Sequence, residues 1–91
     1  MRLKSKEVNV IKQIISNIFD DATVYLFGSR LDESKKGGDI DLFVIAKNPT
    51  FSNKIKALAK LQRELHKPVD IVLHKDFSRT IEQEGLRGVK I

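Results

Sequence analysis

The chain has 91 residues, a length that supports one hydrophobic core and leaves no room for a second. It contains no cysteine, which excludes a disulfide framework and a thiolate metal site. Its formal net charge of +5 favours an anionic partner such as a nucleotide, RNA or an acidic protein. The basic residues are spread along the chain, however, and only one tyrosine and five phenylalanines are available for base stacking. A solvated basic surface is therefore the simpler interpretation of the charge.

The composition also bears on the cellular compartment. Residues 1–7 are too polar for the apolar core of a signal peptide, and no apolar run approaches the roughly 20 residues that cross a bilayer. We expect a soluble, cytoplasmic protein without membrane contact. We see no internal repeat or linker and expect residues 1–91 to form a single domain.

The first half of the chain predicts one helix and two strands. Apolar residues recur at helical spacing from Val8 to Phe19, with Ser5 as a suitable N-cap. The β-branched and aromatic run 23–27 predicts a buried strand. A short helical turn over 31–34 and a lysine- and glycine-rich mobile loop over 35–38 precede a second predicted strand over 39–46.

The second half predicts helix, strand and helix. After a turn at 47–50, Thr50 or Ser52 can cap a helix that ends at residues 66–68. Its expected apolar stripe comprises Ile55, Leu58, Ala59, Gln62 and Leu65. A third strand over 69–73 and a short helix over 80–84, ended by Gly85, complete the chain. We find no place in the small core for Leu86, Val89 and Ile91, which we expect to contact a partner.

The predicted order is α-β-(turn)-β-α-β-α. The helix between the second and third strands is long enough for a right-handed crossover, so these two strands should be parallel. We therefore predict an α/β (α+β) fold with a small three-stranded mixed sheet and flanking helices.

Gly28 and Ser29 directly follow the first predicted strand. Glycine allows a tight turn close to a ligand, serine offers a hydroxyl, and a helix starting there would direct N–H groups at an anion. Taken alone, the pair is more simply a strand-ending turn.

Asp39 and Asp41 lie two residues apart, so in an extended chain they share a face. Two carboxylates about 4 Å apart repel each other by about 4 kcal/mol at an effective dielectric constant of 20, and a divalent cation reverses that effect. Solvated aspartates in the loop before the strand are the alternative.

Asp70 provides a third carboxylate near the start of the third predicted strand. If the second and third strands are adjacent and parallel, Asp70 begins its strand at the same sheet edge as Asp41. Three acids at one edge, opposite a Gly-Ser turn, are typical of two-metal phosphoryl transfer.

Gly28-Ser29, nine intervening residues, Asp39-Ile40-Asp41 and the later Asp70 together resemble the DNA polymerase β superfamily of nucleotidyltransferases. The short length resembles its minimal nucleotidyltransferases, antitoxins whose partners are helical HEPN-domain proteins. The spacing is one residue shorter than in many members, which puts loop contacts in doubt and not the carboxylates.

The resemblance implies a polymerase β-like core and a role for each matched residue. Gly28 and Ser29 would hold the β- and γ-phosphates of a triphosphate, and Arg30 either neutralises phosphate or is a surface residue. We do not expect nucleic acid as the primary ligand. Asp39 and Asp41 would bridge two Mg²⁺ ions, with Mn²⁺ as a substitute. Asp70 would bind the catalytic metal and assist deprotonation of the acceptor.

The predicted function is that of an adenylyltransferase-like enzyme, in which AMP from ATP is transferred to a hydroxyl, a tyrosine of a HEPN-type toxin. Two alternatives remain. One is an inactive domain of this fold that neutralises its partner by binding, and the other is a small basic RNA-binding module. His66 and His74 are interpreted as surface histidines at strand and helix ends.

Overall fold

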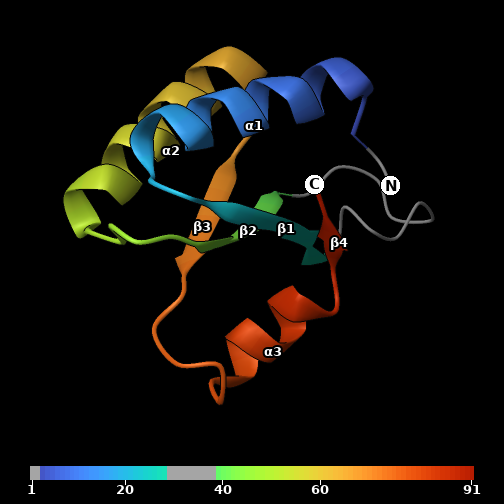
Figure 1. The fold of residues 1–91 in the computed structure, drawn as a ribbon. Coiled ribbons are helices and arrows are strands. Elements are labelled where there is room, and N and C mark those ends of the chain that lie inside the picture. Colours follow the sequence, from blue (N-terminus) through green and yellow to red (C-terminus); the bar gives the residue numbers. More distant parts are fainter. Residues whose placement is uncertain (1–2, 29–38) are drawn as a thin grey trace.

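The structure is a computed structural model that describes residues 3–28 and 39–91. Helices α1 and α2 lie side by side over one face of a four-stranded sheet, and α3 lies on the opposite face (Figure 1). The bounds of the elements are α1 Ser5–Ile18, β1 Thr23–Phe27, β2 Ile40–Ile45, α2 Phe51–Leu65, β3 Val69–Leu73, α3 Thr80–Leu86 and β4 Val89–Lys90. The predicted 31–34 turn and 35–38 loop lie outside the described residues.

The sheet is mixed, with strand order β3-β2-β1-β4. β1 pairs antiparallel with both β2 and β4, whereas β2 and β3 are parallel. Parallel neighbours need a crossover connection, and α2 supplies it. The predicted fold class, element order and parallel pair are confirmed.

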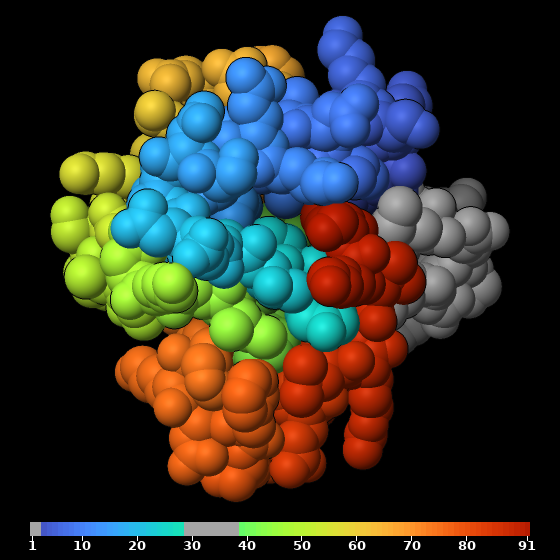
Figure 2. All heavy atoms as spheres, in the orientation of Figure 1, coloured from blue at the N-terminus to red at the C-terminus, as the bar shows by residue number. Residues whose placement is uncertain are grey.

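The prediction of three strands is wrong, because the C-terminus adds a fourth. In β4, Val89 pairs with Leu26 and Lys90 with Tyr25. The N–H of Ile91 also donates to the carbonyl of Val24, at 2.9 Å. A two-residue strand carries no alternating pattern, so only its pairing with β1 reveals it. The C-terminal residues accordingly lie beside β1 on the surface (Figure 2).

The expectation that the last apolar residues lack a place in the core is also wrong in part. Ile91 packs against the hydrophobic core beneath α1. Leu86 and Val89 remain 40% and 42% exposed. The hydrogen bond to Val24 continues the β4 pairing and holds Ile91, which is partly buried, against the core.

Both long helices begin with a capping interaction. Lys4, and not Ser5, is the N-cap of α1, and its N–H donates to the side chain of Glu7 at 3.2 Å. The same Glu7 carboxylate pairs with Lys67 at 2.7 Å, which links the start of α1 to the end of α2. In α2, Thr50 accepts from the N–H of Asn53 at 3.1 Å, as one of the two predicted caps.

The apolar stripe predicted for α2 is rotated relative to the real one. Ala57, Leu61 and Leu65 are the buried residues of this helix, whereas Ile55 is 47% exposed and Ala59 is exposed. Leu58, which belongs to the predicted stripe, is partly buried and packs against the core. Within residues 3–28 and 39–91, no helix combines the length and apolarity needed to cross a membrane.

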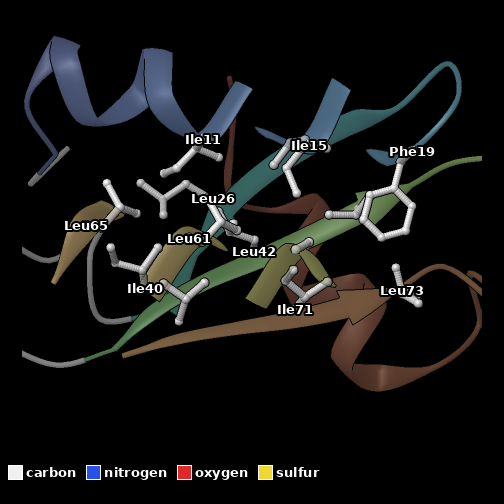
Figure 3. Close-up of a cluster of buried hydrophobic side chains, with 14 of the residues drawn as sticks. Ile11, Ile15, Phe19, Leu26, Ile40, Leu42, Leu61, Leu65, Ile71 and Leu73 are labelled. Carbon is white, nitrogen blue, oxygen red and sulfur yellow. The ribbon is translucent and has the colours of Figure 1, made fainter. Parts of the chain in front are cut away.

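The core lies between the two long helices and the sheet (Figure 3). It is built from side chains that α1, α2 and three strands direct toward one another. Its most deeply buried members include Ile11, Ile15, Phe19, Leu26, Ile40, Leu42, Leu61 and Ile71. Burying a side chain of this kind contributes about 2 kcal/mol, so this layer is the main source of stability.

Two glycines allow α3 to lie close against the other face of the sheet. A Cβ on Gly85 would come within 2.7 Å of the Phe43 side chain, and one on Gly88 would overlap the carbonyl oxygen of Leu26. The prediction that Gly85 ends the helix is therefore wrong. Gly85 lies inside α3, where the absence of a side chain permits close packing.

A buried carboxylate anchors the connection between β3 and α3. Glu82 is 0% exposed. Its carboxylate accepts hydrogen bonds from His74 Nδ1 at 2.6 Å, the N–H groups of Lys75 and Asp76 at 2.8 and 2.9 Å, and Arg79 Nη1 at 2.9 Å. Burial opposes its ionisation, but the bonds from His74 and the two N–H groups outweigh burial and lower the pKa of Glu82 to about 2.

We expect Glu82→Gln to lower the free energy of unfolding by about 3 kcal/mol at neutral pH, because buried cationic and N–H donors lose their anion. The depressed pKa means that the folded state favours the carboxylate. This stabilisation is complete above the ordinary pKa of 4.5 and is lost as the pH falls toward about 2. Urea unfolding at a series of pH values measures both effects.

The matched control is Glu84→Gln, on the same helix but exposed. It should change stability by less than about 0.5 kcal/mol. A difference between the wild type and Glu82→Gln that stays constant from neutral to strongly acidic pH would contradict the assignment.

Candidate active site

Three strand ends meet at one edge of the sheet. Phe27, the last residue of β1, pairs with Asp41 in β2, and Asp41 pairs across the parallel ladder with Asp70 in β3. The antiparallel β1 therefore ends where β2 and β3 begin. This register brings the Gly28 turn and two of the three predicted carboxylates together.

Gly28 closes the end of β1 in a conformation that favours glycine. Its φ is +78°, in the left-handed region. A Cβ at this position would overlap the Oδ2 atom of Asp41. The backbone thus lies directly against the carboxylate. The predicted nucleotide-binding residues Ser29 and Arg30 lie outside the described residues.

Asp41 is the most enclosed of the three carboxylates. It is half-buried, whereas Asp39, which directly precedes β2, and Asp70 are exposed. Burial, followed by the negative charges of Asp70 and Asp39, raises the pKa of Asp41 above its ordinary value. The charge of Asp41 is thus opposed by both other carboxylates, and no ion pair among the described residues compensates it.

The carboxylates are near one another but do not form a finished chelate. Asp70 Oδ1 accepts a hydrogen bond from the N–H of Ile71 at 2.9 Å. Among the side chains that the structure describes, no three acidic, histidine or cysteine groups are arranged to hold a metal ion.

Asp41 and Asp70 face a cleft of about 420 Å³ between the sheet edge and α3. The residues that line it are Phe27, Gly28, Asp41, Asp70, Val72, Ile81, Glu84 and Arg87. The last three come from α3 and its C-cap, and our sequence analysis did not identify them. Their spacing of three residues, which places them on one helical face, was the available signal.

The two histidines are not part of this cleft. His66 is the exposed C-cap of α2, in the left-handed conformation, as expected for a surface histidine at a helix end. His74 differs from the expectation. It is half-buried, bonds to Glu82 and stacks on Phe77 with ring centroids 3.9 Å apart, so it supports the β3–α3 connection.

The sheet order, the strand-end glycine and the facing aspartates define a nucleotidyltransferase fold. The family model "Polymerase beta, Nucleotidyltransferase" matches residues 9–91. The chain belongs to this family.

Several known proteins resemble the chain in sequence or fold. A probable protein adenylyltransferase, MntA, from Haemophilus influenzae is 40% identical over 48 residues, 52% of this chain and 42% of the relative. The chain thus matches less than half the length of this relative.

Two solved structures share the fold. One, a tri-AMPylated HEPN toxin in complex with an MNT antitoxin from Shewanella oneidensis, has a TM-score of 0.74 at 24% identity, covering 94% of this chain and 68% of that one. The other, the toxin–antitoxin pair MntA–HepT, has a TM-score of 0.73 at 20% identity and covers 96% and 70% of the two chains. At these identities, both likenesses bear on the fold alone.

We expect Gly28→Ala to destabilise the protein for two separable reasons. The left-handed backbone would cost about 1 kcal/mol with a side chain present, and overlap with Asp41 adds to it. In an Asp41→Ala background the overlap is gone and only the backbone cost remains. Denaturant unfolding of the two single variants and the double variant measures the coupling. Additive effects of the two substitutions would show that the close approach has no energetic weight.

We expect Asp41→Asn to be as stable as the wild type or more stable at neutral pH without divalent cations. Because its pKa is raised in the folded state, the ionised carboxylate destabilises that state once the pH rises through the folded pKa. The advantage of Asp41→Asn should therefore disappear in acid. Thermal unfolding in EDTA measures it, and a large loss of stability at neutral pH would identify Asp41 as a structural residue.

Proposed function

We propose that residues 1–91 act as one metal-dependent nucleotidyltransferase domain, a cytoplasmic antitoxin that transfers AMP from ATP to a protein hydroxyl. The observation that carries this proposal is the register of β2 and β3. It places Asp41 beside Asp70 and against Gly28 in a cleft of about 420 Å³. This volume falls in the range of small-molecule sites.

The carboxylates suit a hard divalent cation. Burial and mutual repulsion raise the pKa of Asp41, which is the electrostatic signature of an anionic site lacking a counter-charge. Mg²⁺ binds through one or two carboxylates together with substrate phosphates, which suits a set that is not a closed chelate. Asp39, Asp41 and Asp70 would hold Mg²⁺ or Mn²⁺, and the bound metal would neutralise the phosphates.

Other residues of the cleft would position the triphosphate. The backbone of Gly28 can approach phosphate oxygens because it has no side chain. Arg87 is the one cation lining the cleft among the described residues, and its guanidinium suits a phosphate. By family resemblance, Ser29 would add a hydroxyl and Arg30 a further positive charge.

In the proposed reaction, an acceptor hydroxyl oxygen attacks the α-phosphorus of ATP in line with the departing pyrophosphate. The new P–O bond forms as the bond to the pyrophosphate oxygen breaks. The hydroxyl proton would pass to Asp70, whose exposure in the lining of the cleft supports this role. Positioning and charge stabilisation carry most of the catalysis in phosphoryl transfer.

The names of the relatives support the choice of nucleotide and acceptor. A relative is named a protein adenylyltransferase, and a structure of the same fold holds an AMPylated HEPN toxin. We propose that the acceptor is a tyrosine of a HEPN-domain protein. AMP adds bulk and negative charge, which would disfavour RNA binding at a modified toxin site.

A binding-only antitoxin is the second candidate function. It is favoured by the state of the carboxylates. Asp70 accepts a hydrogen bond from the N–H of Ile71, and among residues 3–28 and 39–91 no three acidic, histidine or cysteine side chains are arranged to hold a metal ion. The two candidates differ in whether neutralisation of the toxin requires the carboxylates. A primary role in binding RNA is disfavoured by the acidic character of the cleft.

The test is co-expression of the chain with a HEPN-domain protein encoded by a neighbouring gene, followed by intact-mass measurement of that protein. We expect one or more adenylyl groups on the partner, and a loss of transfer by several orders of magnitude for Asp41→Asn and Asp70→Asn. Asp21→Asn is the matched control, because Asp21 is exposed and pairs with Lys47 away from the cleft. An unmodified partner that Asp41→Asn neutralises as well as the wild type does would favour the binding-only antitoxin.

A further inference from the structure

A second groove lies on the other side of Asp70, along the open edge of β3. β3 is an edge strand of the sheet (Figure 1). The groove has a volume of about 430 Å³ and is walled by residues 70–73 of β3, by the start of α2 and by the β3–α3 connection. We call it the edge groove. Its side-chain walls are Pro49, Phe51, Lys54, Lys75 and Arg79.

Side chains already form hydrogen bonds with part of the outward-facing backbone of β3. The N–H of Ile40 donates to the carbonyl of Pro68, and the N–H of His74 donates to the carbonyl of Val44. The backbone polar groups of the even-numbered residues from 68 to 74 therefore point toward β2. The backbone N–H and C=O groups of residues 69, 71 and 73 consequently point outward, while their side chains are buried in the core. Three of these outward groups are met by side chains: Gln62 accepts from Val69 N–H, Asp70 accepts from Ile71 N–H, and Arg79 donates to the Leu73 carbonyl.

These bonds occupy three of the six outward backbone groups of residues 69, 71 and 73, which makes this edge a poorer template for another strand. The side-chain walls of the groove are therefore the main contacts that we consider for an occupant. The walls offer two kinds of contact. Phe51 is 73% exposed at the start of α2. Three cations, Lys54, Lys75 and Arg79, line the groove against one acid, Asp70.

The two lysines supply the available positive charge. Arg79 already binds Glu82 and the Leu73 carbonyl. None of the ion pairs among the described residues involves Lys54 or Lys75. Negatively charged side chains in the groove could therefore form ion pairs with the ammonium groups of Lys54 and Lys75, and an apolar or aromatic side chain could pack on Phe51.

We propose that the edge groove binds an acidic segment of the acceptor protein and presents its hydroxyl to Asp70. Asp70 lines both this groove and the cleft that holds Gly28 and Asp41, so acceptor and nucleotide would reach it from opposite sides. The role of this segment as the acceptor of AMP rests on the proposed function. The binding of an acidic segment stands on the groove alone.

The dimensions and charge favour a protein segment over nucleic acid. The four residues 70–73 span about 13 Å, which accommodates about four residues of an extended peptide. Nucleic-acid binding draws on a run of phosphate contacts, often six to ten, and this groove has three cations beside an acid. An acidic segment with an aromatic or apolar residue fits these walls better.

The test is titration of ¹⁵N-labelled protein, without nucleotide or metal, with a heptapeptide that carries a central tyrosine between three glutamates on each side. We expect amide shifts confined to residues 51–54 and 70–75. Lys54→Glu/Lys75→Glu should weaken binding at least about tenfold. Lys56→Glu/Lys60→Glu, with the same change in net charge on the exposed part of α2, should bind like the wild type.

Three outcomes would overturn the proposal: no saturable shifts in residues 51–54 and 70–75, equal binding of a peptide with lysines in place of glutamates, or tighter binding of a uridine heptamer at the same amides. Circular dichroism and melting temperature verify that both double variants are folded. In the transfer assay, Lys54→Glu/Lys75→Glu should raise KM for the partner and leave KM for ATP unchanged. Peptide binding without any transfer would leave the groove standing and reject the proposed function.

Discussion

The pairing of Asp41 with Asp70 across the β2–β3 ladder is the constraint on which the rest of the molecule depends. Two acidic side chains at adjacent, parallel strand ends repel each other, and burial adds to the cost of ionising Asp41. The hydrophobic layer beneath α1 and α2 must therefore hold the two strands in register against this repulsion. The immediate chain neighbours of the two aspartates stabilise this register, because they are fully or almost fully buried; they are Ile40, Leu42 and Ile71.

The opposite face of the sheet is organised by different means. α3 is a short helix with few core contacts, and it is positioned by close packing at Gly85 and by the buried Glu82. The hydrogen bonds to Glu82 fix the β3–α3 connection, which contributes Lys75 and Arg79 to the edge groove. One buried carboxylate thus supports the walls of both hollows that meet at Asp70.

Asp70 lines both hollows, and under the proposals above it would serve the two together. The cleft beside Gly28 is acidic and suits a cation with phosphates, whereas the edge groove carries an excess of positive charge. Under the proposals above, a bound divalent cation would bring the triphosphate into the cleft, and an acidic acceptor segment would occupy the edge groove on the other side of Asp70. In a chain of 91 residues, this separation is achieved by a single strand, β3.

The sequence alone determined the parts of the protein that depend on local pattern. Helical spacing, β-branched runs and turn residues predicted α1, α2, the short α3 and three strands, and the length of the crossover predicted that β2 and β3 are parallel. From that pairing followed the meeting of Asp41, Asp70 and the Gly28 turn. Only the tertiary structure decided the rest. β4, the inward position of Ile91, the buried Glu82 and the contributions of Arg87 and Lys54 all depend on contacts between residues far apart in the chain. Such contacts leave no periodic signal, because a two-residue strand, a paired charge and a closely packed glycine are defined by their neighbours in space and not by their neighbours in sequence.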